Sequence, residues 1–170
     1  MNTVQPFDWA GFFRARVYDV APEVPENGIK QGGYRLVYND VEPDWAKHAE
    51  ASRPTSFGTS LGFTLAGQGG PNASAPGSII NVGWDSPAFK AGITPDMQLQ
   101  AVNDQAVSVS NLRQAIVAAE NSNAPIKLLL KRDDQFLTVT LDYHGGLRYP
   151  HLERVESTPD LLDAVLAPVN

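Results

Sequence analysis

The chain has 170 residues, with 13 Lys and Arg against 19 Asp and Glu, and it has no Cys. The net charge of -6 argues against nucleic acid and anionic membranes as partners, and the missing Cys excludes disulfides, thiolate metal sites and a cysteine nucleophile. The apolar fraction of 42% suits one average domain or a smaller one with long flanks, and no apolar stretch is long enough to span a bilayer.

The first predicted element is an N-terminal helix capped by Asp8. Its apolar residues recur at helical spacing and make an aromatic stripe of Trp9, Phe12, Phe13 and Val17. The residues before it have neither the basic nor the apolar region of a signal peptide, so cytoplasm and periplasm both stay open.

Short strands account for most of the following chain. Residues 34–39 read as a first strand, and residues 40–59 as a long connection with one short helix around 44–51. Further strands are expected at 62–65, 78–82, 98–102, 126–131 and 136–141. Residues 67–77, rich in Gly, Pro and Ser, are expected to form an irregular loop.

Two helices are predicted in the second half of the chain. The longer one has Ser110 as its cap and runs from Asn111 to about Asn121, and its apolar stripe consists of Leu112, Ala115, Ile116 and Ala119. The last helix has Thr158 as its cap and Pro159 at its first position. Its expected buried side consists of Leu161, Leu162, Val165 and Leu166.

Two motifs stand out between these elements. In Ser60-Leu61-Gly62-Phe63, the glycine lets successive backbone N–H groups converge into a concavity that can hold a carboxylate. In Ser86-Pro87-Ala88-Phe89-Lys90-Ala91-Gly92, Ser86 can cap a single helical turn and Gly92 can end it.

The order of these features over residues 58–142 resembles a PDZ domain. The segment 60–63 resembles the Gly-Leu-Gly-Phe carboxylate-binding loop, with Ser in place of the first Gly, and the segment 86–92 is similar to the small-helix signature common in bacterial PDZ domains. The resemblance implies a mixed α/β (α+β) fold. It would be a partly open antiparallel β-barrel or sandwich of five to six strands with one short and one long helix, plus an N-terminal and a C-terminal helix.

The resemblance also implies a ligand site. A peptide C-terminus would add as a strand beside Phe63, Thr64 and Leu65, with its carboxylate held by the N–H groups of Leu61, Gly62 and Phe63. The rest of the groove would consist of Ser60, Leu112, Ile116 and Ala119. The alternative for the helix residues is that they belong only to the core. We expect a β-branched residue at position 62 to abolish binding without unfolding the domain.

The flanks add a second resemblance. Residues 8–14 and 33–38, with the tail at 145–154 and 159–168, look like the C-terminal third of the glycyl-aminopeptidase family of zinc metallopeptidases. This implies a helical segment at 1–33 joined to a catalytic domain, a PDZ-like domain at 34–142 (first strand 34–39, connection 40–59, main body 60–142) and a tail at 143–170.

Zinc is expected in the catalytic domain of the parent protein and not in this chain. Such a domain needs an H-E-x-x-H motif, and the only histidines here, His48, His144 and His151, do not form one. No catalytic or metal-binding residue is therefore assigned, and the chain is interpreted as a non-catalytic peptide- or protein-binding module.

Three alternatives to peptide capture are open. The module could instead dock on the catalytic domain of its own parent, with no independent peptide binding. An active site of its own around Asp142 and His144 is disfavoured, because a surface histidine explains this pair. A metal shared by His144 and His151 is disfavoured as well, because Gly145-Gly146 separates them.

Overall fold

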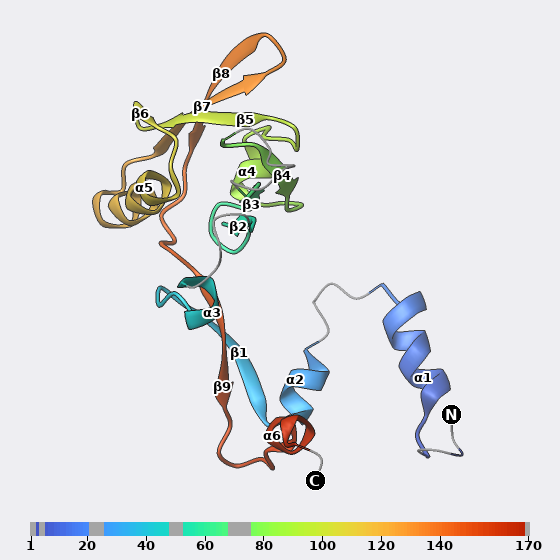
Figure 1. Ribbon diagram of the computed structural model, residues 1–170. Helices are drawn as coiled ribbons and strands as arrows, with labels where there is room; N and C mark the ends of the chain where they lie inside the picture. Colours follow the sequence, from blue (N-terminus) through green and yellow to red (C-terminus); the bar gives the residue numbers. More distant parts are fainter. Residues whose placement is uncertain (1–2, 4–5, 21–25, 48–52, 68–75, 169–170) are drawn as a thin grey trace. The chain divides into compact units, whose positions relative to one another are not determined.

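The computed structural model describes residue 3 and residues 6–20, 26–47, 53–67 and 76–168. The chain forms two compact units, one of residues 1–37 with 152–170 and one of residues 38–151. Both are shown in Figure 1. The boundaries expected from the sequence lay after residues 33 and 142. The strand Tyr34–Asn39 forms as predicted, but its partner is a strand of the tail.

The described residues include short helices and one long helix. The helices are α1 (Trp9–Phe13), continued by the π-helical turn η1 (Arg14–Tyr18), α2 (Asn27–Gln31), α3 (Asp44–Lys47), α4 (Pro87–Lys90), α5 (Val109–Ser122) and α6 (Leu161–Leu166). The strands are β1 (Tyr34–Asn39), β2 (Thr55–Ser56), β3 (Phe63–Leu65), β4 (Ile79–Val82), β5 (Gln98–Val102), β6 (Gln105–Ala106), β7 (Ile126–Arg132), β8 (Gln135–Leu141) and β9 (Tyr149–Arg154).

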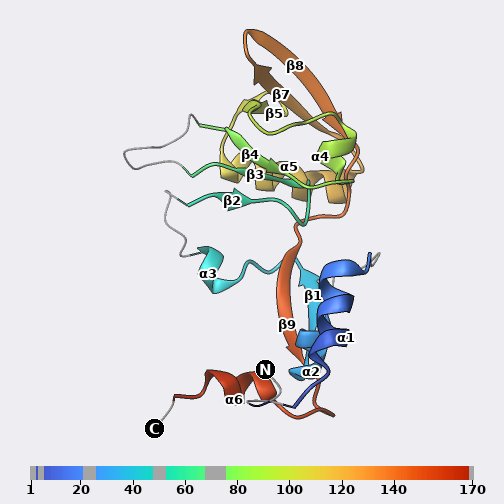
Figure 2. The same cartoon turned by 90° about the vertical axis from the view of Figure 1, so that its right-hand side faces the viewer.

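The unit of residues 38–151 contains two antiparallel sheets. One has the strand order β6-β5-β7-β8, and the other has the order β2-β3-β4. Figure 2 shows β2, β3 and β4 running side by side. A third sheet pairs β1 with β9. The predicted fold class is confirmed: the fold is mixed α/β and PDZ-like, with antiparallel sheets, the short helix α4 and the long helix α5. Among the described strands no sheet closes into a barrel.

The core of this unit lies between α5 and the sheets. All four apolar residues predicted as the helix stripe are buried, and α5 contacts β5 and β7. The strands contribute Phe63, Leu65, Ile79, Leu99, Val102, Ile126, Leu128, Leu130 and Leu141. The alternation of buried and exposed residues in β7 is that of a strand with one face on the core.

Helix starts follow capping chemistry, with two corrections to the predicted residues. Asp8 and Ser86 cap α1 and α4 as expected. The cap of α5 is Ser108 and not Ser110, because the Ser108 hydroxyl accepts from the Asn111 N–H at 3.0 Å. Asp160, and not Thr158, caps α6.

The predicted buried side of α6 is wrong. Leu161, Val165 and Leu166 are 51%, 79% and 72% exposed, and Leu162 is half-buried. A helix of this length has few neighbours to cover it, so its amphipathic pattern alone does not bury it.

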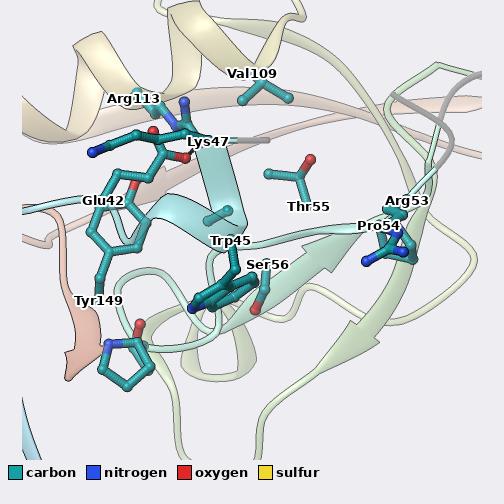
Figure 3. A pocket seen from close by; sticks show the side chains of 13 residues that line it. Glu42, Trp45, Lys47, Arg53, Pro54, Thr55, Ser56, Val109, Arg113 and Tyr149 are labelled. Carbon is teal, nitrogen blue, oxygen red and sulfur yellow. Dashed lines mark hydrogen bonds and ion pairs between the residues drawn. The ribbon is translucent and has the colours of Figure 1, made fainter. Parts of the chain in front are cut away.

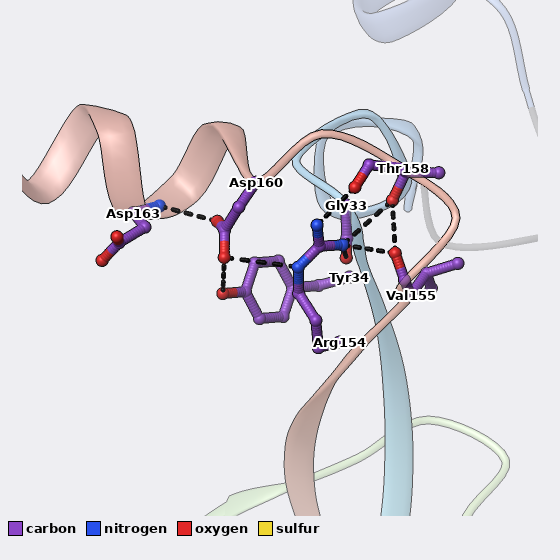
Figure 4. Close-up of polar contacts among 7 residues, drawn as sticks. All are labelled: Gly33, Tyr34, Arg154, Val155, Thr158, Asp160 and Asp163. Atoms are coloured by element: carbon purple, nitrogen blue, oxygen red, sulfur yellow. Dashed lines mark hydrogen bonds and ion pairs between the residues drawn. The ribbon is translucent and has the colours of Figure 1, made fainter.

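Polar contacts of Arg154 hold the tail in the unit of residues 1–37 and 152–170 (Figure 4). The guanidinium donates to the Gly33 carbonyl at 2.7 Å and to the Thr158 hydroxyl at 3.1 Å, and it also bonds to the carbonyls of Val155 and Thr158. Its Nε lies 3.3 Å from the Asp160 carboxylate. A fork of donors thus satisfies the carbonyls of the turn that leads into α6.

Candidate peptide-binding site

The glycine of the predicted carboxylate-binding loop is required by its surroundings. Gly62 has φ of 94°, and a Cβ at this position would lie 2.1 Å from the Cβ of Ser86, the cap of α4. A side chain here meets both backbone strain and a direct overlap. The expectation that a β-branched residue at 62 leaves the fold intact is therefore wrong, because this glycine packs against the small helix.

The loop amides already have a partner from the same chain. The carbonyl oxygen of Phe57 accepts from the Gly62 N–H at 2.8 Å and from the Ser60 N–H at 3.1 Å. A carbonyl oxygen is the kind of acceptor that a ligand carboxylate would present at this point. The Phe57 carbonyl thus engages one of the three amides predicted to hold a ligand carboxylate, that of Gly62.

The edge of β3 beside this loop is also filled. β2 pairs with β3 in antiparallel register, with Thr55 opposite Leu65 and Ser56 opposite Thr64, and the Phe57 N–H donates to the Phe63 carbonyl at 2.8 Å. β4 takes the other edge of β3. A ligand strand at β3 therefore needs β2 to leave first.

The side chain of Phe57 completes an internal ligand-like arrangement. It is 3% exposed, and its ring centroid lies 6.0 Å from that of Phe63. The segment 55–57 runs along β3 toward the loop, places a carbonyl on the loop amide and buries an apolar side chain, as a bound chain end would. Here the chain continues into Gly58.

Most of the other predicted groove residues lie in the core. Leu112, Ile116 and Ala119 are at most 3% exposed, Leu61, Phe63 and Leu65 at most 4%, and Thr64 is half-buried. Ser60 is 6% exposed, and its hydroxyl accepts from the Arg148 N–H at 3.1 Å. Ligand binding by these residues and by the loop amides stays a prediction.

An open groove lies next to β2, within the unit of residues 38–151 (Figure 3). It has a volume of about 470 Å³. Its walls come from α3, from β2 with the residues before it, from the first turn of α5 and from the start of β9: Glu42, Trp45, Ala46, Lys47, Arg53, Pro54, Thr55, Ser56, Thr59, Val109, Arg113, Tyr149 and Pro150. Trp45 is 70% exposed and offers an aromatic surface to an occupant.

The charges of the groove are unevenly compensated. Arg113 forms an ion pair with Glu42, the only acidic side chain among the described lining residues, and Lys47 lies 3.0 Å from Asp44. Arg53 has no ion-pair partner among the residues that the structure describes. The Nε of Arg113 is buried and lacks an acceptor within the same residues. Burial raises the pKa of the Tyr149 phenol in the wall.

Sequence reasoning missed this groove because its walls carry no motif. β2 has two residues, too few for a periodicity, and Tyr149 follows Gly145-Gly146 in a tail that gave no strand signal. The one available signal was the tryptophan Trp45 in the long connection of residues 40–59.

The histidines have hydrogen-bond partners that account for them. His144 contacts the Ala119 carbonyl through Nδ1 at 2.9 Å and the Asp142 carboxylate through Nε2 at 2.8 Å, and His151 contacts the Val41 carbonyl at 2.8 Å. Within the described ranges, no group of three or more His, Cys, Asp or Glu is placed to hold a metal ion, and His48 lies outside them. No described helix is long and apolar enough to cross a membrane.

The PDZ-like fold can be set beside known proteins. No family model and no curated protein sequence matches the chain. Among solved structures, the chain is similar to an aminopeptidase N family protein from Idiomarina loihiensis, with 13% identity and a TM-score of 0.50. The match covers 98% of this chain but only 27% of that protein.

The second structure is the HtrA3 PDZ domain in complex with the phage-derived ligand FGRWV. The identity is 15% and the TM-score 0.33, and the match covers 71% of this chain and 92% of that domain. At 13% identity, the similarity to the aminopeptidase N family protein bears on the fold and not on the function.

Proposed function

We propose that this chain is a non-catalytic module that binds extended peptide segments, and that it does so by strand addition at β2. The observation that carries the proposal is the position of β2, which is the outer strand of its sheet and lies in the wall of the open groove. An edge strand beside a groove gives main-chain hydrogen bonds to a peptide, and the groove gives room for its side chains.

The N–H and C=O groups of Ser56 point in a direction that allows strand addition. In an antiparallel pair, consecutive residues turn their N–H and C=O groups alternately toward and away from the partner strand. Because the Phe57 N–H donates to β3, the N–H and C=O of Ser56 face away from β3. They are the groups that a ligand strand would meet.

We further propose that the module serves a metallo-aminopeptidase. The support is the resemblance of its flanks to glycyl aminopeptidases and the fold similarity to an aminopeptidase N family protein of which it spans 27%. Zinc and the hydrolytic residues would belong to the catalytic domain of that parent. The module would then hold part of a substrate or product peptide while the N-terminal end of that peptide reaches the catalytic centre.

A second candidate is a docking module without peptide binding of its own. It is favoured by one observation: the segment 55–57 already fills the edge of β3 and the loop amide of Gly62. In that case the groove would meet the catalytic domain of the parent at the high effective concentration of a covalent link.

A pair of variants at position 56 tests the proposal. Ser56→Pro removes the outward N–H and leaves the bonds from Phe57 to β3 in place, and Ser56→Ala keeps the N–H. The probes are capped heptapeptides of alternating Val and Thr, and the same peptides with a free C-terminus. We expect calorimetry to detect binding of both forms to wild type and Ser56→Ala and to show its loss in Ser56→Pro.

Each other result has a defined meaning. Absence of binding to wild type rejects the proposal in favour of the docking module. Binding only of peptides with a free C-terminus would indicate that the loop of residues 60–63 holds the terminal carboxylate. Unchanged binding by a folded Ser56→Pro variant would place the peptide elsewhere.

A further inference from the structure

We infer that the groove beside β2 selects peptide segments that carry an acidic side chain, and that Arg53 is the residue that reads it. This deepens the proposed function and rests on it. The occupant to which we commit is an internal, extended segment with a carboxylate at the Arg53 end of the groove.

The first argument is charge complementarity. The chain as a whole carries -6, yet the described residues that line the groove include three basic side chains and one acidic side chain. Glu42 is engaged by Arg113, and Lys47 is next to Asp44, so Arg53 provides the charge without a partner among the described residues. A guanidinium without an ion-pair partner binds a carboxylate in preference to a neutral or basic group.

The second argument is a buried donor without an acceptor. Beyond Arg53, the walls contain the Nε of Arg113, which is buried and has no acceptor among the residues that the structure describes. An occupant rich in oxygen acceptors matches this wall, and a cationic one does not.

The third argument is the layout of the groove. In Figure 3, Arg113 and Glu42 lie on one side of the lining residues and Arg53 with Pro54 on the other. A segment along β2 passes from the Arg113–Glu42 ion pair to Arg53, which has no ion-pair partner among the described residues. One end of the groove thus accepts a neutral residue, and the other selects for charge.

An internal segment fits better than a chain end. The Gly62 N–H, one of the three amides that could cap a terminal carboxylate, already donates to the Phe57 carbonyl. Arg53 is a single side chain on the path of the occupant, and the bidentate fork of Arg suits the carboxylate of Asp or Glu.

The test moves one Glu along a capped, neutral heptapeptide and compares each peptide with its Gln counterpart. The readout is the fluorescence of Trp45 in a chain with Trp9→Phe and Trp84→Phe. We expect one position at which Glu binds about threefold to tenfold more tightly than Gln. This gain should vanish in Arg53→Gln and persist in Arg132→Gln, a control of equal charge change outside the groove.

The outcomes separate this inference from the proposed function. Equal binding of Glu and Gln peptides at every position overturns the selection for acid and leaves peptide binding standing. A Glu preference that survives Arg53→Gln overturns the role of Arg53. Failure of all peptides to bind rejects the proposed function, and the inference with it.

Discussion

The carbonyl oxygen of Phe57 accepts a hydrogen bond from the backbone N–H of Gly62 at 2.8 Å. This contact engages one of the three amides predicted to hold a ligand carboxylate, and the acceptor comes from the chain's own backbone. The same residue donates to the Phe63 carbonyl at 2.8 Å and buries its ring. The segment 55–57 is therefore both a structural strand and an occupant of the position at β3 that a ligand would take.

Removal of the Phe57 ring should strongly destabilise the unit of residues 38–151. Phe57 is 3% exposed and belongs to the core, so Phe57→Ala should lower the free energy of unfolding by about 3 to 5 kcal/mol. Urea unfolding measures this change. Phe136→Ala is the control, because Phe136 is 62% exposed and its loss should cost less than about 1 kcal/mol. Equal effects of the two variants would contradict the internal ligand-like packing.

Alanine at position 62 should cost more than alanine at position 92. Both glycines have positive φ, 94° and 79°, so both replacements carry a backbone cost of about 1 to 2 kcal/mol. At Gly92 a Cβ meets nothing within 4 Å, whereas at Gly62 it overlaps Ser86. Overpacking of this kind adds about 1 to 3 kcal/mol. Thermal or urea unfolding of the two variants compares them, and a Gly62→Ala variant as stable as Gly92→Ala would show that the contact with Ser86 gives way freely.

His144 should make stability depend on pH. Its pKa is raised, first because the Ala119 carbonyl accepts from one ring nitrogen and then because the Asp142 carboxylate accepts from the other. A raised pKa in the folded state contributes stability that is complete below the unfolded value, near about 6.5. This contribution is lost as the pH rises through the higher folded value.

The urea midpoints of wild type and His144→Asn test this dependence. The gap between them should be widest at acidic pH and should narrow as the pH rises above about 6.5. A gap that is constant or widens toward alkaline pH would contradict the assignment. A nuclear magnetic resonance titration of the His144 ring gives the folded pKa directly.

Arg154→Lys should loosen the tail of the unit formed by residues 1–37 and 152–170. Lysine keeps the charge but loses the planar fork that reaches the carbonyls of Gly33 and Thr158. We expect the protection of the α6 amides against hydrogen exchange to fall by about 1 to 3 kcal/mol. Arg35→Lys is the control, because the Arg35–Glu153 pair is well exposed and an exposed ion pair adds little stability. An equal loss of α6 amide protection in Arg154→Lys and Arg35→Lys would contradict the role of Arg154 in holding the tail.

Much of the local structure follows from short-range rules that the sequence displays. Asp8 and Ser86 cap helices because their side-chain oxygens accept nearby N–H groups, and Gly62 and Gly92 occur where φ is positive. The stripe of Leu112, Ala115, Ile116 and Ala119 is buried as its spacing predicts. The PDZ-like fold class could be inferred from these signals in their order.

The sequence by itself thus determined many of the elements, two of the four predicted helix caps and the glycine at the loop, because each depends on residues within a few positions. Only the tertiary structure decided what fills the edge of β3 and where the groove lies. The partner of a strand depends on pairing between distant segments and on burial. A strand of two residues such as β2 is too short for a sequence pattern that would predict its partner. The loop of residues 60–63 can be identified in the sequence, but its contact with the segment 55–57 is seen only in the folded structure.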